Sequence, residues 1–183
     1  ELLLSGNIKS IDIGQDGEMF FSSVIGLGFP SDVMKYHNSK NGGILKGPLT
    51  FLYSIIKALG DLEAERINIS LDDGEIETRS AGILIMNTQY TGGGLRLNPE
   101  GKIDDGVLEV VVIGPVSKKE LVINIPSAYR GSILDHPAID VYHSRRIKVV
   151  EENPSPKMVD GDLYGTSPVD ARVLHKHLKV ISP

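Results

Sequence analysis

The chain has 183 residues, of which 40% are hydrophobic and 23% are charged, and its formal net charge is −5. This length and composition are typical of one globular domain with a sizeable core. The negative charge argues against a nucleic-acid-binding protein, which would show a basic face. The chain has no cysteine, which excludes disulfides and thiolate metal sites, and no apolar run near the ~20 residues of a membrane-spanning helix.

The first eighty residues predict two hairpins and two helices. In chain order we expect a hairpin of strands 8–13 and 18–25, a short helix at 30–36, a polar loop at 37–43, an amphipathic helix at 49–59, and a second hairpin of strands 66–71 and 76–80. Asp72-Asp73-Gly74 is the turn signature of the second hairpin. These elements already favour a protein rich in β-structure.

Strands dominate the rest of the chain as well. Apolar runs rich in β-branched residues predict buried strands at 81–86 and 108–113. We expect further strands at 121–125, 139–142, 145–150, 169–175 and 178–181, and a short helix or loop at 127–136. Many short strands with one or two helices predict a mainly β protein, built as a β-sandwich.

The longest connection, residues 87–106, lies between the two buried strands and is longer than the about 2–5 residues of a hairpin loop. Its first half carries Gly92, Gly93 and Gly94, which allow a close approach of another backbone or of a phosphate. Its second half carries Asp104-Asp105-Gly106, and a carboxylate with free carbonyls suits Mg²⁺ or Ca²⁺. The residues alone favour a simpler interpretation, a glycine turn followed by an Asp-Gly turn, both of which are common in loops.

A specific pattern runs through this connection and the strand that follows it. Its members are Asn87, Gly92 to Gly94, Pro99, Asp104 to Gly106, Leu108 and Val110 to Ile113. In order and spacing the pattern resembles the second domain of the diacylglycerol kinase-like lipid kinases, a family that includes bacterial lipid kinases and sphingosine kinase relatives. Further matches are Gly28-Phe29, Leu45-Lys46-Gly47 and Val159-Asp160-Gly161, whereas Ser22 and Ser23 stand where the family has an Asn.

This resemblance implies a fold and an activity. Residues 1–183 would be the C-terminal β-sandwich, lipid-binding domain of the diacylglycerol kinase/NAD kinase-like fold, in an enzyme that transfers the γ-phosphoryl of ATP to a lipid hydroxyl. The N-terminal nucleotide-binding domain, with its Gly-Gly-Asp-Gly-Thr motif, is absent from this chain. Because the chain begins at Glu1 without Met, we expect a piece of a longer protein that is inactive alone.

The resemblance also implies site residues. Asp162 occupies the position of the family's catalytic base, which is a Glu in the family. Asn87 and Gly92, Gly93 and Gly94 fall at positions expected to face the ATP cofactor. A Mg²⁺ ion would be held by the Asp105 side chain and by the backbone carbonyls of Lys102 and Val107.

The expected partners follow from the same resemblance. They are a lipid substrate, the missing N-terminal kinase domain, the surface of a membrane as a peripheral contact, and a second copy in a homodimer, with no nucleic acid. The expected location is cytoplasmic, and the expected process is lipid metabolism, including phospholipid biosynthesis.

Two other functions stay open at this stage. One is a stand-alone β-sandwich module that binds Ca²⁺ or Mg²⁺ through Asp104-Asp105-Gly106. The other is an NAD kinase-like enzyme with a soluble acceptor, which a deep apolar pocket would argue against. Within the lipid kinase interpretation, diacylglycerol, sphingoid bases and undecaprenol-like alcohols are all candidate acceptors.

Overall fold

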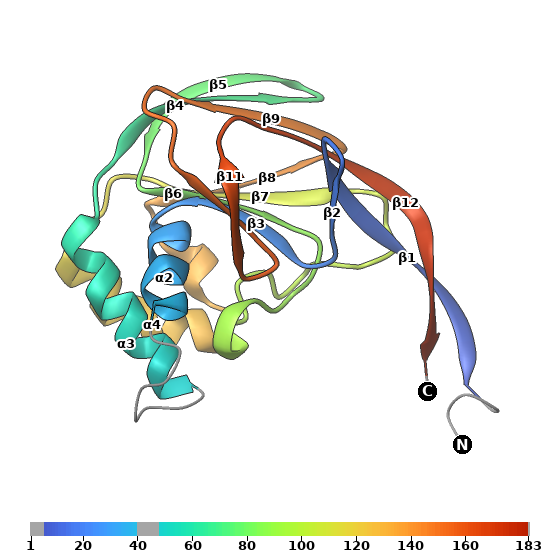
Figure 1. The fold of residues 1–183 in the computed structure, drawn as a ribbon, viewed down its shortest axis with the longest axis horizontal. Coiled ribbons are helices and arrows are strands. Elements are labelled where there is room, and N and C mark those ends of the chain that lie inside the picture. Colours follow the sequence, from blue (N-terminus) through green and yellow to red (C-terminus); the bar gives the residue numbers. More distant parts are fainter. Residues whose placement is uncertain (1–5, 40–47, 183) are drawn as a thin grey trace.

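The structure, a computed structural model, describes residues 6–39 and 48–182. Within them the chain forms two six-stranded antiparallel sheets and three α-helices, which gather on one side of the molecule (Figure 1). The expected β-sandwich is therefore confirmed. The predicted motif Leu45-Lys46-Gly47 and residues 40–43 of the predicted loop lie outside the described residues.

Each sheet draws on both halves of the chain. Sheet A has the strand order β2 (Met19–Phe21), β1 (Asn7–Asp16), β12 (Val169–Ser182), β9 (Arg146–Glu151), β4 (Glu65–Leu71) and β5 (Gly74–Ser80). Sheet B has the order β11 (Asp162–Thr166), β10 (Pro156–Val159), β3 (Val24–Gly28), β6 (Gly82–Met86), β7 (Leu108–Ile113) and β8 (Ile139–Ser144).

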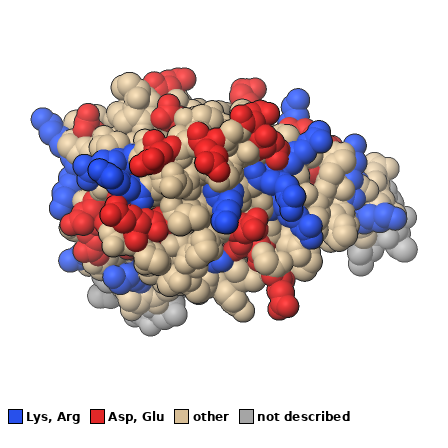
Figure 2. All heavy atoms as spheres, turned by 90° about the horizontal axis from the view of Figure 1, so that it is seen from above, with Lys and Arg blue, Asp and Glu red and all other residues tan. Residues whose placement is uncertain are grey.

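Sheet B is buried on both faces, which explains the unbroken apolar runs of β6 and β7. Successive side chains of a strand point to opposite faces. Ile83 and Ile85 therefore enter the core between the two sheets, while Leu84 and Met86 enter a second core between sheet B and the helices. Sheet A has an outer face in contact with solvent, where acidic and basic side chains are interspersed (Figure 2).

Three helices cover the outer face of sheet B. They are α2 (Phe29–Asn38), α3 (Pro48–Ala58) and α4 (Lys118–Arg130), with short 3₁₀ turns at η1 (Leu59–Asp61), η2 (Gly92–Gly94) and η3 (Ile133–Asp135). The predicted helices at 30–36 and 49–59 correspond to α2 and α3 and are confirmed.

The strand predicted at 121–125 is wrong, because these residues lie inside α4. A capping box starts the helix, in which Ser117 Oγ accepts from Glu120 N and the Glu120 carboxylate accepts from Ser117 N. Gly131, with φ of 85°, ends the helix in the left-handed region. The Leu-Val-Ile-Asn-Ile run imitates strand alternation, but only Leu121 and Ile125 face the core.

The first predicted hairpin is wrong in its second half. The turn and β2 pair with β1 as expected, but the chain bends at Ser22 and Ser23 and continues as β3 in sheet B. Similarly, the strands predicted at 139–142 and 145–150 exist but lie in different sheets, as β8 and β9. In a sandwich, one extended run can leave one sheet and enter the other at a single bend.

Candidate functional site

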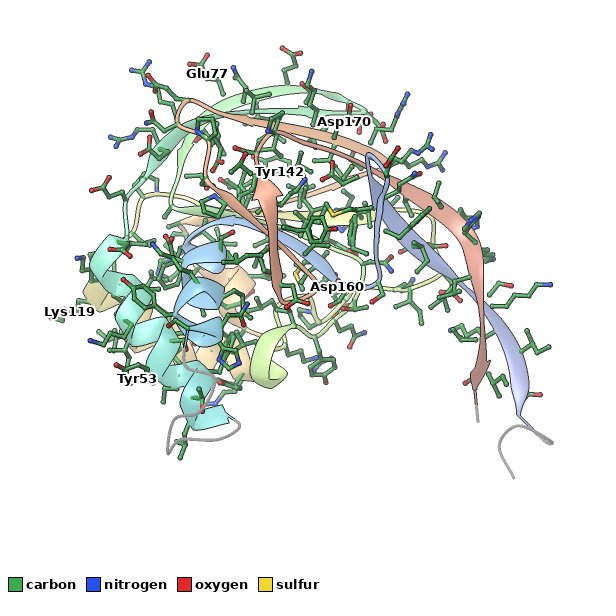
Figure 3. All side chains as sticks on the ribbon, viewed as in Figure 1. Tyr53, Glu77, Lys119, Tyr142, Asp160 and Asp170 are labelled. Atoms are coloured by element: carbon green, nitrogen blue, oxygen red, sulfur yellow. The ribbon has the colours of Figure 1, made fainter. Side chains whose placement is uncertain are left out.

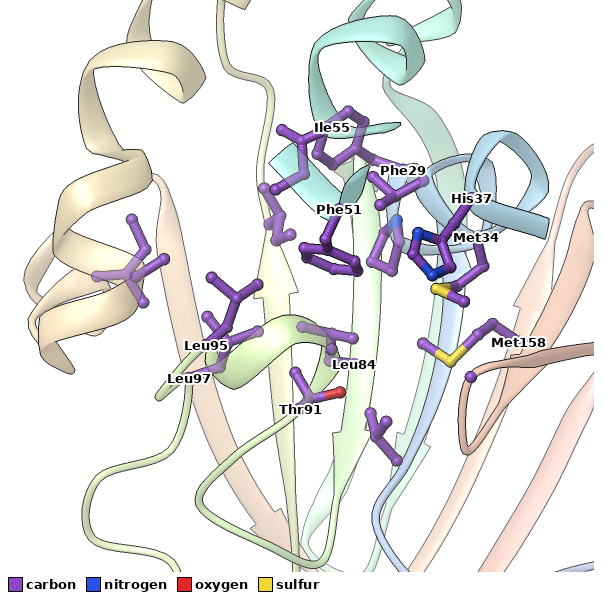
Figure 4. Close-up of a pocket in the computed structure, with 18 of the residues that line it drawn as sticks. Phe29, Met34, His37, Phe51, Ile55, Leu84, Thr91, Leu95, Leu97 and Met158 are labelled. Carbon is purple, nitrogen blue, oxygen red and sulfur yellow. The ribbon is translucent and has the colours of Figure 1, made fainter. Parts of the chain in front are cut away.

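An apolar cavity of about 620 Å³ lies between the helices and the outer face of sheet B. A volume of this order is usual for small-molecule sites, which take about 300–1,000 Å³. Figure 4 shows side chains from α2, α3, the central loop and sheet B pointing into one space: Phe29, Met34, His37, Phe51, Ile55, Leu84, Thr91, Leu95, Leu97 and Met158. Most of these side chains are hydrophobic, so the cavity suits a hydrocarbon chain.

Polar residues meet at one end of the cavity. Ser23 N donates a hydrogen bond to Asp160 Oδ1 over 2.9 Å, and Ser23 Oγ lies 3.3 Å from the Tyr90 carbonyl. Thr91, the next residue, lines the cavity together with Ser23, Asp160 and Gly161. This end therefore brings together the bend between β2 and β3, the central loop and the β10–β11 turn.

The β10–β11 turn is held in place by the carboxylate of Asp160. Asp160 Oδ2 accepts from Ser22 N and Ser22 Oγ at 2.7 and 2.9 Å, and Oδ1 accepts from Ser23 N and Val24 N at 2.9 Å. Asp160 and Gly161 both have positive φ, 47° and 99°, as a two-residue hairpin loop of type I′ requires. The Asp160 side chain sits at the helix-side tip of the hairpin in Figure 3.

Asp162, the predicted catalytic base, is the first residue of β11 and pairs with Val159 across the turn. Its side chain is exposed, and it directly follows two residues that line the cavity. An exposed carboxylate next to an apolar cavity can accept a proton from a hydroxyl at the cavity's end.

Of the three glycines of the central loop, Gly92 forms part of the cavity wall. A Cβ added to Gly92 would lie only 2.6 Å from Cζ of Phe51, so a side chain here would displace the ring. Thr91 and Leu95 exchange backbone hydrogen bonds of 3.0 Å on either side of the glycines. Close packing against α3 thus accounts for Gly92, and Gly94 has a φ of 89° that favours glycine.

The second half of the loop is fixed by Asp12, whose side chain is fully buried. Asp12 Oδ2 accepts from Gly106 N at 2.7 Å, and Oδ1 accepts from Lys176 N at 2.6 Å and lies 2.9 Å from Nδ1 of His175. The backbone N–H of Asp12 also donates to the Ile103 carbonyl over 2.7 Å. The loop segment 103–106 is therefore held on the β1–β12 pair.

Of the predicted metal ligands, Asp105 lies in this fixed segment, and Lys102 and Val107 flank it. Lys102 and Asp105 are exposed, and Asp105 Oδ1 accepts from Val107 N at 3.3 Å, while Asp104 pairs with Lys9 at 3.4 Å. The described residues contain no group of three His, Cys, Asp or Glu placed to hold a metal. A cation here would depend on Asp105 and on backbone carbonyls.

One buried carboxylate near this segment makes a hard cation chemically reasonable. Oε2 of Glu109 is buried and lacks a hydrogen-bond partner among the residues described. Burial raises the pKa of Glu109, and the negative charge of Asp105 adds to the increase. An unpaired carboxylate oxygen of this kind is the type of ligand that Mg²⁺ prefers.

Asn87, predicted to face ATP, is buried with 1% exposure. Its Nδ2 donates to the backbone carbonyls of Asp12 and Ser22, both over 3.0 Å. Together with the hydrogen bonds of Asp12 to Gly106 and of Ser22 to Asp160, these contacts form one continuous network. The network connects the predicted metal loop to the hairpin that carries Asp162.

The structure thus links the predicted residues without placing all of them around the cavity. Gly92 lines the cavity, and Asp162 is next in sequence to residues that do, but neither Asp105 nor Lys102 contributes to its wall. Sequence reasoning missed Asp12 and the anchoring role of Asp160. A buried Asp at the end of an apolar strand, Ile11-Asp12-Ile13, was the available signal for the first.

Comparison with known families agrees with this architecture. Residues 23–182 match the family described as the YegS C-terminal NAD kinase beta sandwich-like domain. The chain belongs to this family. The predicted relationship to the diacylglycerol kinase-like lipid kinases is thereby confirmed for this YegS-type C-terminal domain, as the names of its relatives also indicate.

Two curated relatives are named diacylglycerol kinase. The one from Staphylococcus saprophyticus is 25% identical over 183 residues, which are 100% of this chain and 60% of that protein. The one from Bacillus subtilis is 25% identical over 186 residues and is covered to the same 60%. The chain thus spans about three-fifths of the length of these relatives.

Solved structures share the fold. A crystal structure from Bacillus anthracis str. Sterne aligns with a TM-score of 0.75 at 19% identity, covering 100% of this chain and 59% of that one. A second, named a diacylglycerol kinase from the same strain, aligns with a TM-score of 0.68 at 16% identity and is covered to 57%. Among the described residues, no helix combines the length and apolarity needed to cross a bilayer.

Proposed function

We propose that this YegS-type domain is the lipid-binding part of an ATP-dependent kinase that phosphorylates the hydroxyl of a diacylglycerol-type lipid. The observation that carries the proposal is the 620 Å³ apolar cavity, one end of which is formed by the Asp160-Gly161 turn directly before Asp162. A hydrocarbon chain in this cavity, with the lipid's polar end at the Asp160-Gly161 turn, would bring the lipid hydroxyl close to the exposed carboxylate of Asp162.

The chain's own residues supply positioning and proton transfer. The cavity wall removes the hydrocarbon chain from water, and each buried CH₂ group contributes about 0.8 kcal/mol to binding. Asp160 fixes the turn through its four hydrogen bonds, so Asp162 is held by the rigid hairpin β10–β11. Asp162 accepts the proton of the lipid hydroxyl as that oxygen forms its bond to phosphorus.

The remaining parts of the reaction would come from groups outside this chain. ATP, bound mainly by another domain, would supply the phosphoryl group, and Mg²⁺ would neutralise charge on its phosphates. We assign Asp105, with the carbonyls of Lys102 and Val107, to hold such an ion, and Gly93 and Gly94 to face the nucleotide side, since Gly92 lines the lipid cavity. Asn87 then acts indirectly, because the hydrogen bonds of its Nδ2 position the backbone of Asp12 and Ser22.

A soluble acceptor such as NAD is the weaker alternative. The residues that line the cavity are mostly hydrophobic, and an acceptor rich in phosphates would meet no Lys or Arg among them. A stand-alone Ca²⁺ module gains no support either, because the described residues offer no cluster of three carboxylate or imidazole ligands.

A lipid acceptor also requires access to a bilayer, and the outer surface of α3 and α4 is suited to it. Leu49, Ile56 and Ile123 are 62%, 53% and 63% exposed there, and Lys118 and Lys119 lie beside Ile123 on α4. Apolar side chains with neighbouring lysines favour an anionic membrane surface. Co-sedimentation with anionic vesicles should weaken in Ile123→Glu, and unchanged sedimentation would remove this surface from the proposal.

The proposal is tested by a kinase assay on the full-length protein with labelled ATP and dispersed diacylglycerol. Asp162→Asn should lower kcat by at least about 100-fold, as expected for loss of a general base. Asp162→Glu keeps a carboxylate and should retain much more activity. Asp170→Asn, an exposed Asp on β12, is the matched control and should be unaffected. Equal turnover in Asp162→Asn and wild type would contradict the assignment.

A further inference from the structure

Two polar atoms in residues that line the apolar cavity have no hydrogen-bond partner among the residues the structure describes. They are Nδ1 of His37, near the end of α2, and Oγ1 of Thr50, in the first turn of α3. Both atoms are buried. A buried polar group without a partner costs about 1–3 kcal/mol, and native proteins satisfy most such groups. These two atoms are therefore candidates for contact with a ligand.

Two other polar side chains of the helices around the cavity are paired. Asn124, which lines the cavity, donates to the carbonyl of Glu120 over 2.9 Å, within α4. Ser54, one turn after Thr50 on α3, donates to the Thr50 carbonyl over 2.9 Å. A polar side chain on these helices can therefore find a partner within its own helix, whereas His37 Nδ1 and Thr50 Oγ1 have none among the described residues.

His37 lies toward the end of the cavity that adjoins the β10–β11 turn, and Thr50 directly precedes the residue whose ring contacts His37. The His37 ring meets the Phe51 ring edge to face, with centroids 5.8 Å apart, and Phe51 directly follows Thr50. Figure 4 shows His37 beside Met34, and a Cβ on Gly161 would lie 3.9 Å from Cε of Met34. A group bound by this pair would therefore be near the turn that precedes Asp162.

The chemistry of the pair selects a carbonyl group. A threonine hydroxyl can donate one hydrogen bond, a neutral imidazole can donate one through a ring N–H, and a carbonyl oxygen can accept two. Acyl esters carry such an oxygen next to the hydrocarbon chain. Polyprenols and free sphingoid bases have no carbonyl, so they would leave both atoms unpaired.

We propose that His37 and Thr50 bind the acyl carbonyl of the diacylglycerol-type lipid and so select an ester over an analogue without the carbonyl. This inference rests on the proposed lipid kinase function and assigns two specificity-determining residues to the same cavity. A site built to hydrogen-bond a group discriminates strongly against an analogue that lacks it.

The test compares dioctanoylglycerol with its dioctyl ether, which has the same chain length without the carbonyl, as substrates of the full-length protein. Wild type should prefer the ester by about tenfold in kcat/KM. Thr50→Val and His37→Phe, which keep shape and ring contact, should each bring the ratio to about 3 or less. Ser54→Ala removes a paired hydroxyl from the same helix and should keep the wild-type ratio.

A wild-type ratio near one, or a ratio that both variants retain, would overturn the inference while leaving the kinase function intact. Turnover of neither lipid would count against the proposed function itself. In that case, competition against a bound fluorescent acylglycerol decides the inference. Stronger competition by the ester than by the ether, lost in Thr50→Val, supports it, and equal competition overturns it.

Discussion

The two cores of this domain share sheet B but differ in how completely they are filled. Between the sheets, side chains such as Ile69, Val110 and Val149 are fully buried, and the core is closed. Between sheet B and the helices, equally hydrophobic residues surround a cavity of about 620 Å³. The difference indicates that two packed sheets provide rigidity, whereas helices laid across one sheet can leave room for a ligand.

The largest expected effect compares neighbouring residues of β6 that point into the two cores. Ile85→Ala should lower the free energy of unfolding by about 3–4 kcal/mol, because it opens a cavity in a closed core. Leu84→Ala should lose only about 1–2 kcal/mol, since Leu84 already faces an open cavity and has fewer contacts to lose. Urea unfolding measures both, and equal losses would show that the two cores are packed alike.

The second largest effect is expected at the Asp160-Gly161 turn, at one end of the cavity between sheet B and the helices. Asp160→Asn keeps a residue that tolerates positive φ but replaces one acceptor oxygen by an NH₂ group that faces backbone donors. Stability should fall by about 2 kcal/mol. Asp170→Asn, on the surface of sheet A, should change it by less than about 0.5 kcal/mol. A loss in both variants alike would mean that the hydrogen bonds of Asp160 are not what holds the turn.

A smaller loss of stability is expected at Gly92, in the wall of the cavity between sheet B and the helices. Gly92→Ala places a Cβ against the Phe51 ring, and because the ring can move into the cavity, the cost should be only about 1 kcal/mol. Gly60→Ala, where an added Cβ meets nothing within 4 Å, should be neutral or slightly stabilising. Combining Gly92→Ala with Phe51→Leu should restore most of the loss, as measured by thermal unfolding, and no restoration would locate the strain elsewhere.

The helix layer also carries a carboxyl group, that of Asp32, whose pKa is raised by burial. Burial raises the pKa of Asp32 from 3.8 to about 6, Lys35 opposes this, and Asp61 and Glu151 add to it. The stabilising effect of protonated Asp32 is complete below about pH 4 and is lost as pH rises through about 6. Asp32→Asn should therefore stabilise the protein by at most about 1 kcal/mol at pH 8, allowing for solvent screening, and by nothing at pH 4. An equal effect at both pH values would contradict this.

The comparison of cores also explains what the sequence could predict. The strands β6 and β7 were predictable because both of their faces are buried, which leaves unbroken apolar runs. The helix α4 was not, because Val122 and Ile123 are exposed hydrophobic residues within an apparent strand pattern. Asp162 could be named only through family resemblance.

The contacts that hold the site together are distant in sequence and left no local pattern. Asp160 binds residues 136 to 138 positions away, and Asp12 binds Gly106 across 94 positions. No spacing rule connects such residues, since their meeting depends on the pairing of two sheets. The sequence therefore identified the loop at residues 87–106 and the Asp160-Gly161 turn, whereas only the fold shows how Asn87 connects them.

The most direct test of the account is the affinity of the full-length protein for a fluorescent acylglycerol after the cavity has been filled. Ala128→Trp places a large ring into the cavity from α4, and Glu77→Trp places the same ring on the exposed face of β5 as a control. We expect Ala128→Trp to weaken binding at least about tenfold while the melting temperature stays close to that of wild type. Wild-type affinity in Ala128→Trp would contradict the claim that the open core holds the lipid.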